Sequence, residues 1–359
     1  MGETLIEIKD LRVEFDVRAG IVKAVDGLSF NINRGETLGV IGESGCGKSM
    51  TARAILQMIP KPGKVTNGEV LYYRRAKANG MSETVDVVNI TKLDPDGEVI
   101  RQIRGGEIGM IFQEPMSSLT PVYTAGVHIS EAVSLHHLTP LKKVGDQIAE
   151  NIQAHRNVTK PEARQIAIDM LRRVGIPKPQ ERVDSYPHQL SGGQRQRVMI
   201  AVALSCEPTM LIADEPTTAL DVSIEAQILD LMRELQETVN MAIMFITHNL
   251  GVIAEMANEI VVMYMGKQVE RASAVDLFYD AKHPYTRALL KSIPQVGKKT
   301  SDRLATIEGM VPDPFNLPTG CVFHPRCPMF MPGKCDKIAP TWHQIKENHW
   351  VSCLLYEEV

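Results

Sequence analysis

Short apolar runs bounded by turn residues fill the first third of the chain. Most of these runs are typical of strands, whereas the apolar spacing over 49–58 is helical and stops before Pro60. The polar stretch over 74–97 predicts a surface excursion. Strands are expected at 5–8, 22–30, 36–41, 68–73 and 107–112.

Strands and helices alternate regularly after residue 190. This alternation predicts a mainly parallel sheet covered by helices, because the connection between two parallel strands needs a crossover, usually a helix. Helices are expected at 194–204, 223–237 and 250–256, and strands at 210–213, 241–246 and 260–265.

The middle of the chain is predicted to be helical. Residues 119–137 resemble residues 138–156, with Leu, Thr, Pro, Gly, Ile, Glu and His in register. Two interpretations stay open: a local duplication that lengthens a helical subdomain, or two unrelated amphipathic helices. One repeat does not make a solenoid, which needs at least about three units.

Composition places the chain among ordinary globular proteins. Its 359 residues suggest about two domains, and the 44% of hydrophobic residues supply a core. The net charge of −4 disfavours a general nucleic-acid binder. No apolar stretch approaches the roughly 18–20 residues of a membrane span, and the N-terminus does not resemble a secretory signal. We therefore expect a soluble cytosolic protein, or one that a partner docks on a membrane.

Cysteine and proline usage sets the last part of the chain apart. Nine of the 21 prolines fall between Pro284 and Pro340, which predicts a loop-rich appendage after about Arg271. Of the six cysteines, Cys46 and Cys206 stand alone. The other four crowd the end of the chain, which in a reducing compartment is more typical of a metal site than of disulfides. These four are Cys321, Cys327, Cys335 and Cys353.

The strongest chemical signal is a glycine-rich loop between the strand at 36–41 and the helix at 49–58, which fits G-x-x-x-x-G-K-[ST]. Glycines let backbone N–H groups converge on phosphate oxygens, and the helix N-terminus adds about half a positive charge there. Lys48 would reach the β- and γ-phosphates, and the Ser49 hydroxyl would bind Mg²⁺. This phosphate loop comprises Gly42, Glu43, Ser44, Gly45, Cys46, Gly47, Lys48 and Ser49.

The apolar strand at 210–213 is followed by two carboxylates, Asp214 and Glu215. Strands of open α/β sheets end in this way when their carboxyl ends face a ligand. Asp214 suits Mg²⁺ through its water shell, whereas Glu215 can polarise an attacking water. The alternative, a solvated strand end, is less favoured beside a phosphate loop.

A third motif identifies a family. The sequence LSGGQ, with Ser191, Gly192, Gly193 and Gln194, follows the phosphate loop and precedes the carboxylate strand. In this order the motifs resemble those of the ATPase subunits of ABC transporters. Further elements of the family follow the same order: Gln113 as the Q-loop glutamine, Asp221 in the D-loop and His248 as the switch histidine.

The resemblance implies that two ATPase subunits pair head to tail. The LSGGQ segment is a second nest of N–H groups at a helix start, and it covers the ATP held by the phosphate loop of the other subunit. Glu215 is implied as the general base. His248 would hold the γ-phosphate and the water in line, and Gln113 would bind Mg²⁺ and report nucleotide occupancy to a membrane partner. Met50, next to the loop, is also expected to bind the nucleotide, and Phe15 is the candidate aromatic that stacks on adenine.

Several segments resemble the oligopeptide/dipeptide importer branch of this family. The resemblance implies an α/β P-loop NTPase fold with a RecA-like parallel sheet core, an antiparallel β subdomain and a helical subdomain over about 114–190. An ABC ATPase domain is expected at 1–271 and a loop-rich extension at 272–359. A polar insertion at 74–85 departs from the branch, as does the possible duplication. The segments are GESGCGKS, FQEPMSSL, YPHQLSGGQ, DEPTTALD, KHPYT, LPTGC and PRC.

The four late cysteines are spaced C-x5-C-x7-C-x17-C. Some dipeptide-importer ATPases carry a [4Fe–4S] cluster on cysteines so placed, and four thiolates are the ligand set of such a cluster. Zn²⁺ also accepts four thiolates, although the paired C-x2-C knuckle is missing. Unliganded thiols are a third possibility. We expect the nearby His324, His343 and His349 to be surface residues rather than ligands.

The resemblance implies an ATP-hydrolysing subunit that energises import of di- or oligopeptides. Implied partners are two transmembrane permease subunits, a second ATP-binding subunit, identical or different, and indirectly an extracytoplasmic solute-binding protein. The chain is expected to lie peripherally on the cytoplasmic face of the cell membrane. No nucleic-acid partner is expected. Alternatives are the same role with oligosaccharide or nickel as cargo, or a soluble ABC ATPase outside transport. A regulatory role for the extension, sensing metal or redox state, also stays open.

Overall fold

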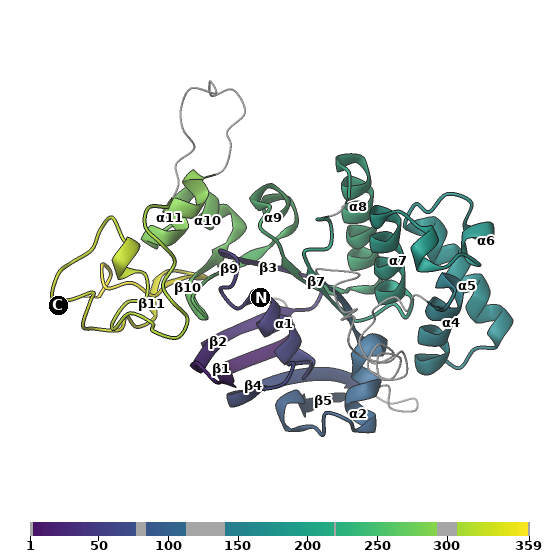
Figure 1. Cartoon of the computed structure of the whole chain (residues 1–359), viewed down its shortest axis with the longest axis horizontal. Coiled ribbons are helices and arrows are strands. Elements are labelled where there is room, and N and C mark those ends of the chain that lie inside the picture. Colours follow the sequence, from purple (N-terminus) through teal and green to yellow (C-terminus); the bar gives the residue numbers. More distant parts are fainter. Residues whose placement is uncertain (1–2, 77–83, 113–140, 219, 293–306, 358–359) are drawn as a thin grey trace. The chain divides into compact units, whose positions relative to one another are not determined.

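The computed structural model divides the chain into two compact units, each with its own strands and helices (Figure 1). Unit 1 comprises Met1–Glu3, Asn33–Glu36 and Leu93–Met244, and unit 2 comprises Thr4–Ile32, Thr37–Lys92 and Phe245–Val359. The residues that the structure describes are 3–76, 84–112, 141–218, 220–292 and 307–357.

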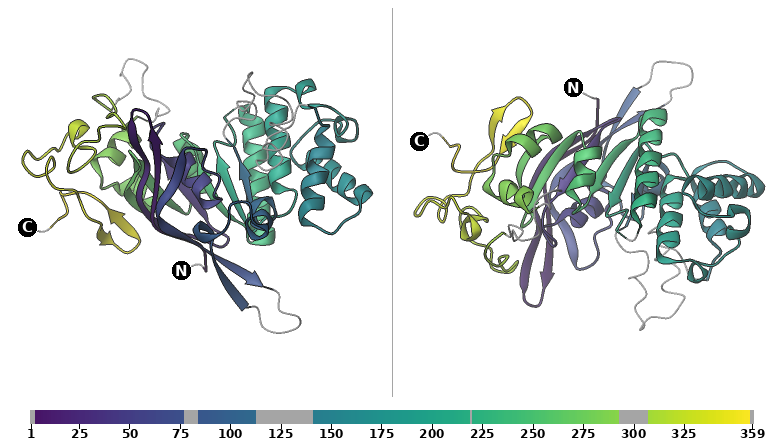
Figure 2. Two further views of the ribbon diagram at one scale, coloured as in Figure 1. Left: turned by 60° about the horizontal axis from the view of Figure 1, so that its bottom comes forward. Right: turned by 90° about the horizontal axis from the view of Figure 1, so that it is seen from above.

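An antiparallel sheet in unit 2 has the strand order β2-β1-β4-β5 (Figure 2). In the pairing of β1 with β4, Ile8 lies opposite Val70 and Val13 lies opposite Val65. The side chains of Ile8, Val13 and Val70 are buried. Apolar residues on one face and polar residues on the other are typical of an antiparallel sheet with one solvated face. The strands are β1 (Thr4–Val17), β2 (Gly20–Asn33), β4 (Gly63–Ala76) and β5 (Thr84–Asn89).

The prediction of a surface excursion over 74–97 is wrong in part. Residues 74–76 continue β4, and β5 pairs with β4 from Leu71↔Asn89 to Ala76↔Thr84. Val85 and Val87 of β5 are each 50% exposed. An edge strand with a solvated face carries polar residues at many positions, so its composition resembles that of a loop.

A second sheet in unit 2 joins the strand before the phosphate loop to the end of the chain, in the order β3-β9-β10-β12-β11. Strands β3 and β9 are parallel, with Val40 opposite Val261, and the later pairs are antiparallel. The strands are β3 (Thr37–Ile41), β9 (Glu259–Tyr264), β10 (Lys267–Ser273), β11 (His343–Lys346) and β12 (His349–Val351). The helices of unit 2 are α1 (Lys48–Ile55), α9 (Leu250–Met256), α10 (Ala274–Asp280) and α11 (Pro284–Lys291), with short turns at Ile90–Lys92 and His324–Arg326.

Unit 1 contains a pair of parallel buried strands and most of the helices that lie beside β7 in Figure 1. In this pair Ile108 lies opposite Met210 and Ile111 opposite Ala213, so both strands end at the same edge. The strands are β6 (Ile108–Ile111) and β7 (Met210–Asp214), and β8 (Ala242–Ile246) spans the division between the units. The helices are α2 (Glu98–Gln102), α4 (Val144–His155), α5 (Lys160–Arg173), α6 (Pro179–Arg182), α7 (Gly192–Leu204) and α8 (Val222–Val239), with short turns at Ile103–Glu107 and Pro187–Gln189.

The alternation predicted after residue 190 is confirmed by α7, β7, α8, β8, α9 and β9. The helix expected at 49–58 runs from Lys48 to Ile55. The first copy of the possible duplication, 119–137, and the start of the second copy lie outside the described residues, so that interpretation stays a prediction. The expected boundary at 271–272 and the helical subdomain at 114–190 also stay predictions.

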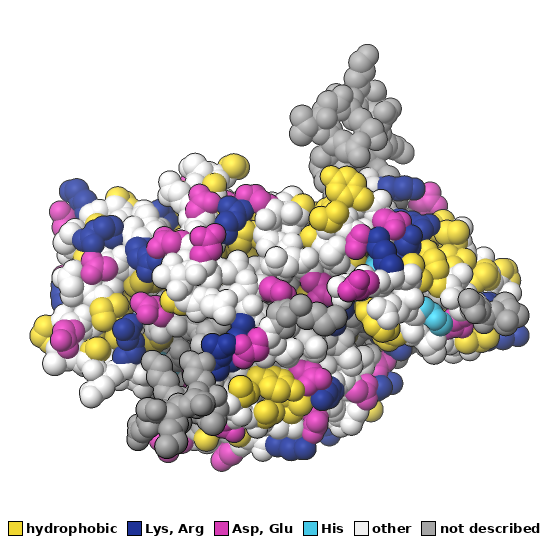
Figure 3. Space-filling view, turned by 180° about the vertical axis from the view of Figure 1, so that it is seen from behind, with side chains coloured by type: hydrophobic (Ala, Val, Ile, Leu, Met, Phe, Trp, Pro, Cys, Tyr) yellow, Lys and Arg dark blue, Asp and Glu magenta, His cyan; other side chains and the backbone are white. Residues whose placement is uncertain are grey.

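No helix in the described ranges combines the length and the apolar character that a membrane crossing needs. On the face drawn in Figure 3, basic and acidic side chains are interspersed. This mixture agrees with the near balance of 39 basic and 43 acidic residues in the sequence.

Candidate nucleotide site and cysteine pocket

The phosphate loop leads from the buried strand β3 into α1. Gly42 has φ 152° and Gly47 has φ 102°, values that favour glycine. A Cβ at Gly42 would lie 2.2 Å from the Met263 carbonyl oxygen, and one at Gly47 would lie 2.2 Å from the Ala24 carbonyl oxygen. The loop therefore requires glycine at both positions, for its dihedral angles and for close backbone approach.

Lys48 is buried at the start of α1, with 7% of its surface exposed. Its ammonium donates to the carbonyl oxygens of Gly42 at 2.8 Å and Glu43 at 3.0 Å, so the loop itself holds the cation. The Cys46 thiol lies 3.7 Å from the same nitrogen, yet burial raises the pKa of that thiol. Ser49 follows on the helix and is half-buried, as is Met50.

In unit 1, β7 brings two carboxylates to the end of the parallel pair. Asp214 is 3% exposed, whereas Glu215 is half-buried and has φ 50°. A left-handed backbone at a residue other than glycine is strained, and such strain clusters at functional turns. The Thr218 hydroxyl donates to Glu215 Oε2 at 3.2 Å, which helps to hold the turn.

The LSGGQ segment begins helix α7 with a capping box. Ser191 Oγ accepts from the Gln194 N–H at 3.3 Å, and Gln194 Oε1 accepts from the Ser191 N–H at 3.1 Å. Gly192 is exposed, and a Cβ built on it would meet nothing within 4 Å. Packing within the described residues therefore does not require this glycine, whereas Gly193 is half-buried. The start of a 13-residue helix offers N–H groups to an anion.

Helix α7 is tied to the carboxylate turn inside unit 1. The buried Gln196 side chain donates to the Pro216 carbonyl oxygen at 2.8 Å. Thr217 Oγ1 donates to Glu225 Oε1 at 2.7 Å, which joins the same turn to α8. The LSGGQ helix, the carboxylates and α8 are therefore one connected group.

Asp221 and His248 lie next to helix starts. Asp221 is the N-cap of α8, and its Oδ1 accepts the Ile224 N–H at 3.0 Å, a bond that lowers the pKa of its carboxyl. His248, in unit 2, follows β8 and is exposed. The next residue, Asn249, caps α9 by accepting the Gly251 N–H at 3.1 Å.

The remaining predicted contacts to nucleotide are one aromatic ring and one glutamine. Phe15, near the end of β1, is half-buried opposite Gly63 of β4, and a Cβ at Gly63 would lie 2.5 Å from its ring. Phe15 therefore packs on β4, in the same unit as the phosphate loop. Gln113 lies outside the described residues, and Phe112 before it is buried.

Comparison with known families decides the assignment. Residues 25–218 match the family described as ABC transporter, a match that covers more than half of the chain and includes the phosphate loop, LSGGQ and both carboxylates. The chain belongs to the ABC transporter family. Residues 269–335 of this ABC ATPase match a second family, described as oligopeptide/dipeptide transporter, C-terminal region.

Relatives and solved structures agree with this assignment. The ABC ATPase is 44% identical over 356 residues to the oligopeptide transport ATP-binding protein AppD of Bacillus subtilis, covering 99% of this chain and 98% of the relative. It is 41% identical over 357 residues to the dipeptide transport ATP-binding protein DppD of the same bacterium, covering 99% and 96%. A dimeric ATP-binding cassette in a post-hydrolysis state, bound to ADP and Pi, aligns with TM-score 0.61 and 25% identity, covering 75% of this chain and 99% of that one.

These matches confirm the expected fold class, an α/β P-loop ATPase of the ABC type. They also confirm the expected activity, because an ABC ATPase domain binds ATP with Mg²⁺ and hydrolyses it.

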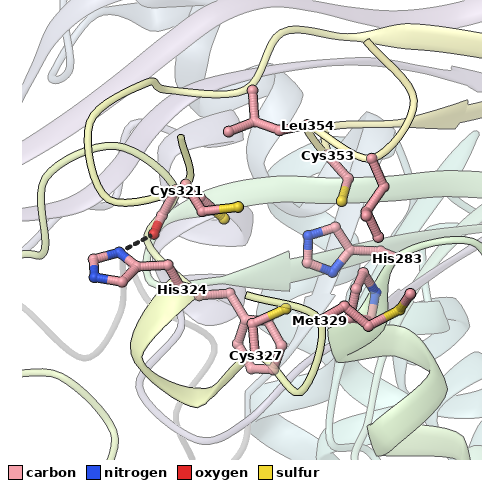
Figure 4. A pocket seen from close by; sticks show the side chains of 11 residues that line it. His283, Cys321, His324, Cys327, Met329, Cys353 and Leu354 are labelled. Atoms are coloured by element: carbon pink, nitrogen blue, oxygen red, sulfur yellow. Dashed lines mark hydrogen bonds between the residues drawn. The ribbon is translucent and has the colours of Figure 1, made fainter. Parts of the chain in front are cut away.

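The C-terminal region of this ABC ATPase brings its four late cysteines to one pocket (Figure 4). Burial raises the pKa of the Cys321 and Cys327 thiols, and it raises that of Cys353 to about 11. Across the described residues, no group of three or more His, Cys, Asp or Glu side chains is arranged to hold a metal ion. The metal expected at these cysteines is therefore not supported by their geometry. Besides the cysteines, the pocket is lined by His283, Pro284, Phe323, His324, Met329, Leu354 and Leu355.

The expectation of surface histidines is wrong for His349. This residue lies on β12, which pairs with β10, and its ring is fully buried with Nε2 2.7 Å from Glu270 Oε1. His324 is half-buried, its Nδ1 lies 2.9 Å from the Cys321 carbonyl oxygen, and it lines the cysteine pocket (Figure 4). His343 is half-buried, 3.3 Å from a Glu357 carboxylate oxygen.

Sequence reasoning missed two residues that contact the phosphate loop. Tyr285 and Arg326 both bind Glu43. Both residues belong to the KHPYT and PRC segments that resemble the importer branch. The segments therefore carried a signal, but sequence order does not say which loop such side chains contact.

Proposed function

We propose that this chain is the ATP-hydrolysing subunit of a peptide importer and that it works as one of a pair of ATPase subunits. In the pair, the ATP held by the phosphate loop of one subunit is covered by the LSGGQ segment of the other. The exposed start of α7 carries the proposal, because Gly192 has open space where a side chain would be and the helix end attracts anions. A ligand presented from outside the chain explains a glycine that its own packing does not require.

We assign the binding of the triphosphate to the phosphate loop, and the binding of Mg²⁺ to three residues with oxygen ligands. Lys48 neutralises the β- and γ-phosphates, and the backbone N–H groups of the loop cradle them. Ser49 and Gln113 would hold Mg²⁺ through their side-chain oxygens, and Asp214 would hold it through its water shell. Phe15 stacks on adenine.

We assign the chemistry of hydrolysis to Glu215 and His248. Glu215 is the general base that activates the attacking water, a role that contributes about 10²- to 10⁴-fold in rate. His248 holds the γ-phosphate and the water in line. Asp221 stands at the D-loop, where its cap of α8 sets the start of that helix.

The relatives favour peptides as the cargo over oligosaccharides or nickel. They also favour a role in transport over that of a soluble ABC ATPase that takes no part in transport. Proteins named for oligopeptide and dipeptide transport match almost the full length of the chain, including its C-terminal region. The chain then acts with two membrane-spanning permease subunits and a second ATP-binding subunit, peripherally at the cytoplasmic face of the cell membrane. A solute-binding protein outside the membrane supplies the peptide.

The transport role is tested by reconstitution. The chain, its co-encoded membrane subunits and a second ATPase subunit are placed in lipid nanodiscs, and ATPase activity is measured with a peptide-loaded binding protein. A rise in ATPase rate with di- or oligopeptide, and none with the Lys48→Ala chain, is expected. Stimulation of the ATPase rate by nickel or by an oligosaccharide would contradict the assignment. A rate that does not respond to peptide would contradict it as well.

We propose further that the cysteine pocket is the place of a [4Fe–4S] cluster held by Cys321, Cys327, Cys335 and Cys353. Four thiols that share one pocket supply the donor set of such a cluster, which would have to draw them into a ligand arrangement that they do not have in this structure. The cluster would serve there as a structural staple. The raised thiol pKa values mean that the thiols hold their protons at neutral pH, and a cluster would displace those protons.

Iron, acid-labile sulfide and zinc are measured after anaerobic purification, with broad visible absorption as a second readout. About four iron and four sulfide per chain are expected for one cluster. Stoichiometric zinc, or neither metal, would overturn the proposal, and a variant with Cys321 and Cys327 changed to Ser is the matched control.

A further inference from the structure

The second residue of the phosphate loop is held by the C-terminal region of the chain. Two nitrogens of the Arg326 guanidinium donate to the Glu43 carboxylate, Nη1 to Oε2 at 2.6 Å and Nη2 to Oε1 at 3.0 Å. The Glu43 backbone N–H donates to the Tyr285 hydroxyl at 2.9 Å. Because a two-pronged Arg–carboxylate pair fixes direction as well as distance, Glu43 is held at its side chain and at its backbone.

Arg326 is itself immobilised. Its side chain is 4% exposed, and it donates to the Tyr264 hydroxyl at 3.3 Å while lying 5.9 Å from the centre of that ring. Tyr264, Tyr285 and Phe323 pack against one another with ring centres 4.7–5.3 Å apart, and all three are buried. The guanidinium therefore rests on a rigid aromatic platform.

Glu43 in turn positions Lys48. The Glu43 carbonyl oxygen accepts from Lys48 Nζ at 3.0 Å and from the Cys46 N–H at 3.3 Å. A shift of Glu43 would therefore move the cation that meets the phosphates and change the curve of the loop. The chain of contacts runs from Arg326 through Glu43 to Lys48.

Arg326 lies in the chain between two cysteines that line the cysteine pocket. It ends the short turn His324–Arg326, which lies between Cys321 and Cys327. The His324 N–H donates to the Cys321 carbonyl oxygen at 3.0 Å, and the Cys327 N–H donates to the His324 carbonyl oxygen at 3.2 Å. A displacement of either cysteine would therefore displace Arg326.

We propose that Arg326 is a positioning residue for ATP binding, which holds the phosphate loop through Glu43 and couples it to the state of the cysteine pocket. Loss of the Arg326–Glu43 pair lowers the affinity for MgATP, because the loop is no longer preorganised. The inference rests on the proposed function only for ATP binding at the phosphate loop. Neither the cargo nor the identity of a metal at the cysteines enters it.

A double-mutant cycle on the full chain tests the first link. Arg326→Met and Glu43→Ala should each raise the Kd for MgATP about tenfold, and the double variant should be no worse than either single one. In steady-state assays KM should rise while kcat changes by less than about twofold. Arg326→Lys, which keeps the charge but loses the paired geometry, should fall between wild type and Arg326→Met. If Arg326→Met does not fold, Arg326→Lys and Glu43→Ala still test the pair.

Arg271→Met is the matched control. Arg271 makes an equally two-pronged pair with Glu259, with both hydrogen bonds at 2.7 Å, and Glu259 lies opposite Leu38, at the other end of β3 from the phosphate loop. The Kd of the Arg271→Met variant for MgATP should equal that of the wild-type chain. An Arg326→Met protein with wild-type affinity, or effects of Arg326→Met and Glu43→Ala that add, would overturn the proposal. A wild-type chain that fails to bind ATP would instead overturn the proposed function.

Alkylation tests the second link. The chain carries Cys46→Ser and Cys206→Ser and is first stripped of any bound metal with a chelator. Iodoacetamide then reaches only the four late cysteines, as free thiols, and mass spectrometry counts the labels. Alkylation should raise the Kd for MgATP about fivefold or more in this background and leave it unchanged when Arg326→Met is added. An equal shift in both proteins, or no shift in either, would overturn the coupling.

Discussion

Glu270 and His349 form a fully buried pair, with Glu270 Oε1 2.7 Å from His349 Nε2 and neither side chain exposed. Glu270 also accepts the backbone N–H groups of Lys282 at 2.6 Å and His283 at 3.0 Å. One carboxylate on β10 thus joins β12 and the segment that leads into α11, so it fastens the C-terminal region to the sheet of unit 2.

Glu270→Ala should lower the free energy of unfolding by about 3 kcal/mol, because it leaves two backbone N–H groups and a buried histidine without their acceptor. Thermal and urea unfolding would measure this change. Glu259→Ala is the control, since Glu259 is 21% exposed in its pair with Arg271 and its loss should cost about 1 kcal/mol or less. Equal losses in the two variants would mean that burial of the Glu270 network matters little.

Gly192→Ala should leave stability unchanged or slightly raised, because the added methyl group meets no atom within 4 Å and alanine favours helices. Its ATPase activity should nevertheless fall at least about tenfold, since the methyl group would meet the nucleotide of the partner subunit. Circular dichroism and steady-state ATPase assays separate the two effects. Gly109→Ala offers the contrast, because its Cβ would lie 2.5 Å from the Ala203 carbonyl oxygen and should destabilise the fold. Full activity of Gly192→Ala would remove the support for the paired arrangement.

Lys48→Ala should raise the Kd for MgATP about 30- to 100-fold, because it removes a charged hydrogen-bond donor to phosphate. Titration with a fluorescent ATP analogue would measure it. An unchanged affinity would count against the phosphate loop as the ATP site.

Glu215→Gln should bind MgATP as wild type does but hydrolyse it at least about 100-fold more slowly, because the general base is lost. A nucleotide-bridged dimer should then accumulate, which size-exclusion chromatography with MgATP would detect. Glu237→Gln, at an exposed position on α8, is the control and should leave turnover intact. Retained hydrolysis in Glu215→Gln would mean that another residue is the base.

Cys46 should react slowly with iodoacetamide, because the thiolate is the reactive form and burial raises the pKa of this thiol. Its alkylation rate should still be rising at a pH where the rate of an ordinary, exposed thiol has already levelled off. The unfolded chain loses this proton first, so the shift also removes stability as the pH rises above the ordinary thiol pKa. Peptide mass spectrometry over a pH series measures the rate, with an unstructured cysteine peptide as reference, and a plateau at the same pH as the reference would contradict the prediction.

Local patterns were enough to predict the strand–loop–helix around Lys48 and the helix after LSGGQ. These features depend on residues only a few positions apart, so the sequence is enough to predict them. They are the glycines with φ 152° and 102° and the capping box at Ser191. The β4–β5 hairpin was missed because its partly exposed strand has the composition of a loop.

The sequence by itself determined the family, the fold class, the phosphate loop and the four-cysteine motif, because each depends on short segments whose residue types and spacing are fixed by local chemistry. Only the tertiary structure decided that His349 is buried against Glu270, that the four thiols share one pocket, and that Arg326 meets Glu43, 283 positions away in the chain. Such contacts depend on which buried polar groups find partners once the strands have paired, and no local pattern specifies that choice.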